Sequence, residues 1–220
     1  MARRCASLLA FSLLLGTAPL PGRAAGAPVG VERLELDARL DPSGPALYAK
    51  ANMVLRNRSR APVELVEFQL PAPLGARTTV ENVWDRNGQL AWRSDSVEAD
   101  QPLAITVALR LPLAPGDRQR IVVSFAMKLE GLESPAAAQV SAQSARLATS
   151  GWYPALAGSE PALPEWIRLT VRLPKDWRVE GATRPKRVME GTASSSYEVT
   201  LGHMTPDALL FGATAPSAAK

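Results

Sequence analysis

The stretch that decides the fold is LAITVALRLPLAPGDRQRIVVSFAMK, residues 103–128. Apolar residues take every second position in both of its halves, namely Leu103, Ile105, Val107, Leu109 and Leu111, and then Ile121, Val123, Phe125 and Met127. A period of two places alternate side chains on opposite faces of a strand. The stretch therefore predicts two β-strands, each with one buried face, joined by turn residues 114–117 (APGD).

The same alternation recurs on both sides of this stretch. Clear examples are residues 34–40, 49–55 and 167–173, and shorter strands are predicted at 63–70, 78–84, 177–181, 196–201 and 209–213. Residues 41–44 (DPSG) and 86–88 (RNG) have turn chemistry, and short turns favour antiparallel hairpins between neighbouring strands. We expect an all-β, antiparallel β-sandwich of about ten or more strands.

One long segment, about 131–164, lacks this periodicity and is expected to be an irregular loop that contains GWYPAL, residues 151–156. Trp152 and Tyr153 are large side chains to place in a loop, and Pro154 restricts the backbone after them. In one interpretation these three residues bind a partner, so that Trp152 is partly exposed in the isolated chain and its truncation changes stability little. In the other they fold back and cap their own sandwich.

The amino terminus has the pattern of a secretory signal. Arg3 and Arg4 precede the apolar run 6–15, which is too short to span a bilayer, and small residues follow it. We expect a signal peptide at 1–24, with the cut as late as 27 in an alternative, a single β-sandwich domain at 29–215, and a short tail at 216–220. This predicts a periplasmic or secreted protein without an integral membrane segment after signal removal.

Signal removal would also change the charge and the cysteine content. The formal charge of +4 includes three arginines before residue 25 and no acid, so the remainder carries +1, which makes no case for a nucleic-acid partner. Cys5 is the one cysteine and would leave with the signal. Without disulfides, the domain must be stabilised by a hydrophobic core. The roughly 195 residues that remain are enough to form such a core.

Few side chains offer catalytic chemistry. His203 is the one histidine, which excludes a zinc site with several histidines, and the expected loss of Cys5 with the signal excludes a Cys-His pair. A serine triad through His203 and the nearby Asp207 lacks a nucleophile-elbow pattern. The remaining candidates are carboxylate pairs, Glu130 with Glu133 and Glu160 with Glu165, which are as readily explained as solvated loop charges. We predict no catalytic residue, no metal ligand and no cofactor.

Asn57-Arg58-Ser59 spells a glycosylation sequon. We interpret it instead as a turn that follows a strand and precedes Pro62.

Several segments in fixed order resemble one known domain, from about Val31 to Ala215. They are residues 55–57 (LRN), 70–71 (LP), 83–90 (VWDRNGQL), 113–125 (LAPGDRQRIVVSF), 152–154 (WYP) and 171–181 (VRLPKDWRVEG). Together they are similar to the amino-terminal β domain of the aminopeptidase-N-like (gluzincin) zinc peptidases. The family's H-E-x-x-H and G-A-M-E-N motifs belong to a following domain and do not occur in this chain. The resemblance therefore carries over no zinc-binding or catalytic residue.

The resemblance implies that Trp152, Tyr153 and Pro154 lie near an interface, because the family's β domain packs against the catalytic domain. It implies a non-catalytic, protein-binding or scaffolding module that docks on a separate catalytic chain or an envelope protein. Two alternatives stay open. One is a carbohydrate- or envelope-binding sandwich that stacks Trp84, Trp92, Trp152 or Tyr153 on sugars, and the other is a shortened metallopeptidase fragment without activity.

Overall fold

The structure is a computed structural model that describes residues 28–95, 98, 101–132, 137–158, 164–181, 184–202 and 208–216. The described residues form sixteen strands and one short 3₁₀ turn, so the all-β prediction is confirmed. The first eight strands are β1 (Val29–Asp41), β2 (Ala46–Asn57), β3 (Val63–Leu70), β4 (Thr78–Asp85), β5 (Gly88–Gln89), β6 (Ala91–Ser94), β7 (Leu103–Leu113) and β8 (Arg118–Lys128). The others are β9 (Ala138–Val140), β10 (Ser144–Ala148), β11 (Ala155–Leu156), β12 (Trp166–Pro174), β13 (Arg178–Gly181), β14 (Lys186–Glu190), β15 (Ser194–Leu201) and β16 (Leu209–Thr214). Among these residues, no helix has the length and apolar character needed to cross a membrane.

The largest sheet has eight strands in the order β14-β15-β12-β1-β2-β8-β4-β5. Its centre is the antiparallel ladder of β1, β2 and β8, with β1 and β2 joined by the predicted turn at 41–44. On these strands the alternate apolar residues are almost completely buried, while their neighbours, apart from the buried Ala46 and Ser124, are partly or fully exposed. The sheet therefore has one apolar inner face and one polar outer face.

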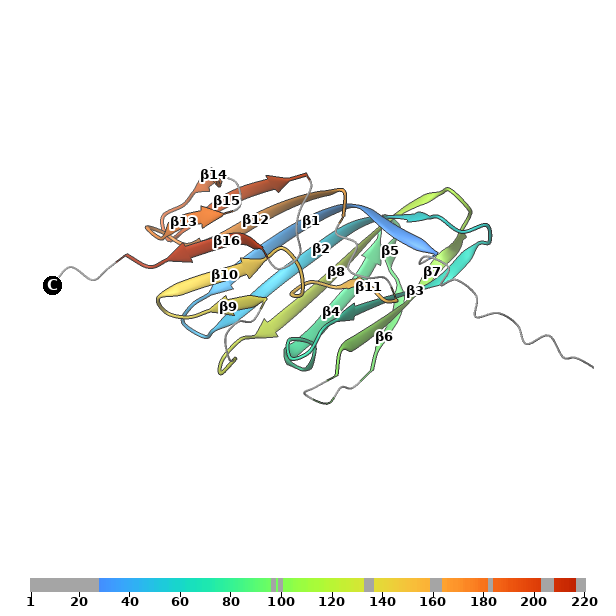
Figure 1. Ribbon diagram of the computed structural model, residues 1–220, viewed down its shortest axis with the longest axis horizontal. Coiled ribbons are helices and arrows are strands. Elements are labelled where there is room, and N and C mark those ends of the chain that lie inside the picture. The colour runs from blue at the N-terminus through green and yellow to red at the C-terminus, as the bar shows by residue number, and fades with distance from the viewer. Residues whose placement is uncertain are drawn as a thin grey trace, which may run out of the picture.

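Two four-stranded sheets cover the inner face, with the orders β13-β16-β10-β9 and β11-β3-β7-β6. Figure 1 shows them in front of different parts of the large sheet, the first across β12, β1 and β2, and the second across β4 and β8. Buried residues from all three sheets belong to one apolar cluster. The architecture is thus a sandwich in which two small sheets share one core with the large sheet.

Two details of the strand pairing differ from the expectation. The turn at 114–117 does not join a hairpin, because β7 pairs with β3 and β6 whereas β8 pairs with β2 and β4. The turn instead carries the chain from a small sheet to the large one. It is held there by Asn57, whose backbone bonds to both Gly116 and Asp117. β7 and β8 each pair on both sides, but within different sheets, and these ladders override the local preference for a hairpin. The second surprise is that β1 and β12 pair in parallel, so the large sheet is mixed.

The expected irregular loop at 131–164 is also shorter than predicted. It contains β9, β10 and β11, which are three, five and two residues long. Their alternation is hard to recognise because the strands are short: β10 has only Ala145 and Leu147 buried, between the exposed Ser144 and Arg146. Tertiary pairing with β16 and β3 makes these residues strands.

Asn57 confirms the interpretation of the sequon as a turn. Its side chain is buried, and its Nδ2 donates hydrogen bonds to the carbonyls of Ala61 and Leu113 at 2.8 and 2.7 Å. Its Oδ1 accepts from the Ser59 backbone. Both amide hydrogens therefore hold the turn in place, and the nitrogen is not accessible for a glycan.

Gly75, in the 3₁₀ turn Gly75–Arg77, tests the contact between β3 and β7. A Cβ at this position would lie 2.6 Å from the Leu103 backbone nitrogen and 2.8 Å from the Leu70 carbonyl oxygen. We expect Gly75→Ala to lower the free energy of unfolding by about 1–3 kcal/mol, because backbone atoms must move. The matched control is Gly44→Ala, where the nearest atom is 3.9 Å away, and denaturant unfolding of both variants measures the difference. Equal stability of the two variants would contradict the packing described.

Candidate functional site

The GWYPAL segment is anchored inside the sandwich. Trp152 is 0% exposed and Tyr153 is 4% exposed, and their rings meet edge to face with centroids 5.4 Å apart. The indole Nε1 donates to the Ala148 carbonyl at 2.7 Å, and the Tyr153 hydroxyl donates to the Thr149 carbonyl at 2.7 Å. The two donors thus bond to the last residue of β10 and to the residue that follows it. The rings can therefore lie in the core without leaving a donor unsatisfied.

This burial overturns our expectation that Trp152 is partly exposed in the isolated chain. The interpretation in which the segment caps its own sandwich is the one that the structure supports, and Pro154 is buried as well. The physical reason lies in the backbone around the rings. Gly151 has a φ of 84°, a conformation that turns the chain inward after β10, and β11 then pairs with β3. A partner contact through Trp152, Tyr153 and Pro154 stays a prediction.

Truncation of Trp152 measures how much this anchor stabilises the fold. We expect Trp152→Ala to cost about 3–5 kcal/mol of unfolding free energy, in the range of buried aromatic deletions. Trp166→Ala is the control, because that partly exposed ring lies on the outer face beneath Arg33. It should cost about 1 kcal/mol or less. A Trp152→Ala variant as stable as the control would restore the interface interpretation.

Tyr153 predicts a dependence of stability on alkaline pH. Burial raises the pKa of its hydroxyl well above the ordinary value. A tyrosine whose pKa is raised in the folded state stabilises the fold fully below its unfolded pKa of about 10 and progressively less above it. We expect the unfolding free energy to decline above about pH 10 more steeply in the wild type than in Tyr153→Phe. Urea unfolding of both proteins across that range would show parallel curves if the hydroxyl were solvated.

Four adjacent strands of the large sheet gather many charged side chains on its outer face. By register, the side chains of β12, β1, β2 and β8 that point away from the core include nine cations and four carboxylates. The cations are Arg33, Arg39, Lys50, Arg56, Arg118, Arg120, Lys128, Arg168 and Arg172, and the carboxylates are Glu32, Glu35, Asp37 and Asp41. We call this surface the basic face, and its net charge is +5.

Two glutamates organise most of these arginines. Glu35 accepts from Arg33 at 2.7 Å, from Arg168 at 2.8 Å and from Asn52 at 2.7 Å. Glu32 accepts from Arg118 at 2.6 Å and from Arg56 at 3.2 Å. The Arg118 hydrogen bond, with a smaller contribution from Arg56, lowers the pKa of Glu32. Glu32 therefore stays ionised at neutral pH, and the two glutamates together hold arginines of four strands.

The structure describes only two of the catalytic candidates considered in the sequence, Glu130 and Glu165. His203, Asp207, Glu133 and Glu160 lie outside the described residues. Glu130 is exposed, and Glu165 is exposed and lies 3.7 Å from Arg58. Among the residues that the structure describes, no group of three or more His, Cys, Asp or Glu side chains is placed to hold a metal ion. Trp152 and Tyr153 are buried and present no open ring to a sugar.

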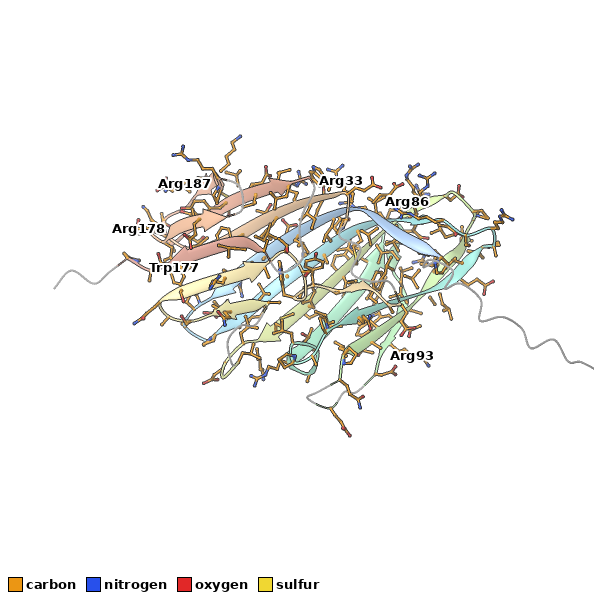
Figure 2. All side chains as sticks on the ribbon, viewed as in Figure 1. Arg33, Arg86, Arg93, Trp177, Arg178 and Arg187 are labelled. Atoms are coloured by element: carbon orange, nitrogen blue, oxygen red, sulfur yellow. The ribbon has the colours of Figure 1, made fainter. Side chains whose placement is uncertain are left out.

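The sequence analysis missed a cleft at the end of the large sheet. It has a volume of about 700 Å³ and is lined by residues of β1, β12, β15 and the turns that follow β1, β9 and β12. Arg39, Arg172 and Trp177 are among its lining residues. Figure 2 shows Trp177 next to Arg178, at the end of the molecule where β13 and β16 lie. In the sequence, Arg39 and Arg172 each occupy an outward position of an alternating strand. Only the parallel pairing of β1 and β12 makes them neighbours.

Comparison with known proteins supports the fold. No family model matches the sequence, and no curated protein matches it either. Among solved structures, the chain is similar to an M1 zinc metallopeptidase from Deinococcus radiodurans, with a TM-score of 0.62 and 18% identity. A point mutant of that enzyme aligns with a TM-score of 0.64 and 17% identity. The same mutant bound to a Tyr-Ser-Ala substrate aligns with a TM-score of 0.62 and 18% identity.

The similarity to these enzymes is partial in length. Each alignment covers 86% of this chain but only 42% or 43% of the metallopeptidase chain. At this identity the similarity is one of fold. It confirms the expected resemblance to the amino-terminal β domain of these peptidases at that level.

Proposed function

We propose that this chain acts as an exported, non-catalytic β-sandwich module that binds a separate catalytic chain of the zinc-peptidase type. The observation that carries the proposal is the unequal coverage. The structural alignment covers 86% of this chain but only 42% of the zinc metallopeptidase chain. The zinc site and the general base would then be supplied by the partner, because neither the H-E-x-x-H nor the G-A-M-E-N motif occurs in this sequence.

A scaffolding role fits the way the molecule is built. The large sheet and the two small sheets enclose one apolar core and present turns and sheet edges to solvent. Such a domain can offer a preformed surface to a partner, which limits the entropy lost on binding. The fold by itself does not specify function, so the proposal depends on the partner and not on the sandwich architecture.

The GWYPAL segment has a revised role in this proposal. Trp152 and Tyr153 anchor the loop from inside, and the less buried Ala155, Ala157 and Gly158 form its outer side. A partner that docks on this loop would therefore contact a surface held rigid by the two rings. Trp152, Tyr153 and Pro154 would then contribute to binding by fixing the shape of the loop.

The proposed location is the periplasm or the extracellular space. It rests on the charged residues, apolar run and small residues of the first 24 positions, which have the pattern of a secretory signal. It agrees with a domain that needs no disulfide, because Cys5 is the one cysteine of the chain. The partner would share this compartment, as a peptidase-type chain or another envelope protein.

Metal and activity measurements on the purified protein test its non-catalytic character. We expect less than stoichiometric zinc by elemental analysis and no cleavage of aminoacyl reporter substrates, because the chain lacks the family's zinc motif. A known zinc aminopeptidase assayed in parallel is the positive control. One tightly held zinc per chain together with chelator-sensitive hydrolysis would refute the proposal.

The docking itself is tested in the cells that produce the protein. A tagged copy, crosslinked before lysis, should retain one chain that contains an H-E-x-x-H motif, and the pair should reassociate when both are purified separately. An Ala157→Arg variant, changed on the less buried side of the loop, should weaken the pair, and its melting temperature checks that the domain stays folded. Recovery of no zinc-peptidase-type chain, or of one that does not rebind when purified, would contradict docking.

A further inference from the structure

The cleft at the end of the large sheet brings together two arginines that are not neutralised locally. Arg39 of β1 and Arg172 of β12 are direct partners in the parallel register, so both side chains leave neighbouring strands on the same side. Both line the cleft. Within the described residues, the arginines that pair with Glu32 and Glu35 are others, and neither Arg39 nor Arg172 forms an ion pair.

One carboxylate, that of Asp41, also lines the cleft, and it already accepts hydrogen bonds from its own turn. Oδ1 of Asp41 accepts from the Ser43 hydroxyl at 2.6 Å, from the Ser43 backbone at 3.1 Å and from the Gly44 backbone at 3.4 Å. The Ser43 hydroxyl is also the largest cause of the lowered pKa of Asp41, to which Arg39 contributes from a longer distance. Asp41 thus shapes the turn, and the two arginines leave the lining with a positive charge.

Arg39 is held in an orientation suited to binding. Its guanidinium carbon lies 4.6 Å from the centre of the Tyr48 ring. Stacking of this kind occupies the face of the guanidinium and leaves its N–H donors free in the plane of the group. Together with Arg172 on the neighbouring strand, it matches the oxygens of phosphate, sulfate or carboxylate, which arginine binds through paired hydrogen bonds.

The charge of the surrounding surface favours the same kind of ligand. Residues 25–220 carry a net charge of +1, because three of the 25 basic residues and none of the 21 acidic residues precede them. Since the basic face alone carries +5, the rest of this segment carries −4. The basic face is therefore more positive than the segment as a whole, and its field attracts anions toward the cleft at its end.

The geometry points to an anion-binding site: we propose that Arg39 and Arg172 hold a phosphate, sulfate or carboxylate group of a ligand in this cleft. Trp177 and Pro174 give the cleft an apolar side, and Ser194 provides a hydroxyl. The ligand is a free small anion or an anionic group carried by an acidic polysaccharide. The site is independent of the proposed docking on a catalytic chain, since it uses residues outside the GWYPAL loop.

The first experiment titrates the purified protein with inorganic phosphate and follows the arginine Nε–H signals by NMR. We expect saturable shifts of the Arg39 and Arg172 signals. Arg172→Gln should weaken phosphate binding about tenfold or more, the effect of losing charge-assisted hydrogen bonds. The matched control is Arg187→Gln, because Arg187 is an arginine of β14 that pairs with Glu190 outside the cleft. It should leave the affinity unchanged.

The second experiment distinguishes the two ligand sources with heparin, a sulfated polysaccharide. A polymer would lie along the basic face, so heparin would bind more tightly than phosphate, and Arg120→Gln would weaken it together with Arg172→Gln. A free small anion would be insensitive to Arg120→Gln. Thermal melts confirm that each variant is folded. The proposal is overturned if neither probe shifts the Arg39 and Arg172 signals, or if Arg39→Gln and Arg172→Gln leave both affinities unchanged.

Discussion

One-sided burial of the large sheet is the constraint on which the rest of this structure depends. Successive residues of β1, β2 and β8 alternate between a core that excludes water and a face that is open to it. A slip of one residue in any of these ladders would bring arginines and glutamates into the core and leucines to the surface. The cost of burying unpaired charges fixes the register, and the register then decides the composition of both faces.

The two faces have different roles. The inner face packs against both small sheets, and the Trp152–Tyr153 pair closes the core where β10 gives way to β11. The outer face carries the charged side chains of these strands. Glu32 and Glu35 accept hydrogen bonds from several of its arginines. The same alternation thus produces the stability of the domain and its charged surface. The proposed binding or scaffolding role would use the fixed shape and the fixed charges of this surface.

The fold class could be predicted from the sequence because alternation is a local signal. Val63–Leu70 was predicted at its observed bounds, and the turn at 41–44 joins the strands expected. Pairings that depend on distant residues could not be predicted: the parallel β1–β12 contact and the corner at 114–117 both depend on strands that are far apart in the sequence. The burial of Trp152 was missed for a similar reason. A loop sequence does not show that its indole can reach the Ala148 carbonyl and the core. Likewise, Arg39 and Arg172 are 133 positions apart and become neighbours only through the parallel pairing.

The central claim is that all three sheets share one core, and calorimetric unfolding tests it most directly. If the small sheets depend on the inner face of the large one, the protein should unfold in a single transition. The enthalpy measured by calorimetry should then equal the van't Hoff enthalpy, and tryptophan fluorescence and far-ultraviolet dichroism should report the same midpoint. Two resolved transitions, or a fluorescence midpoint that differs from the dichroism midpoint, would show that a small sheet folds independently of the large sheet and would contradict the account.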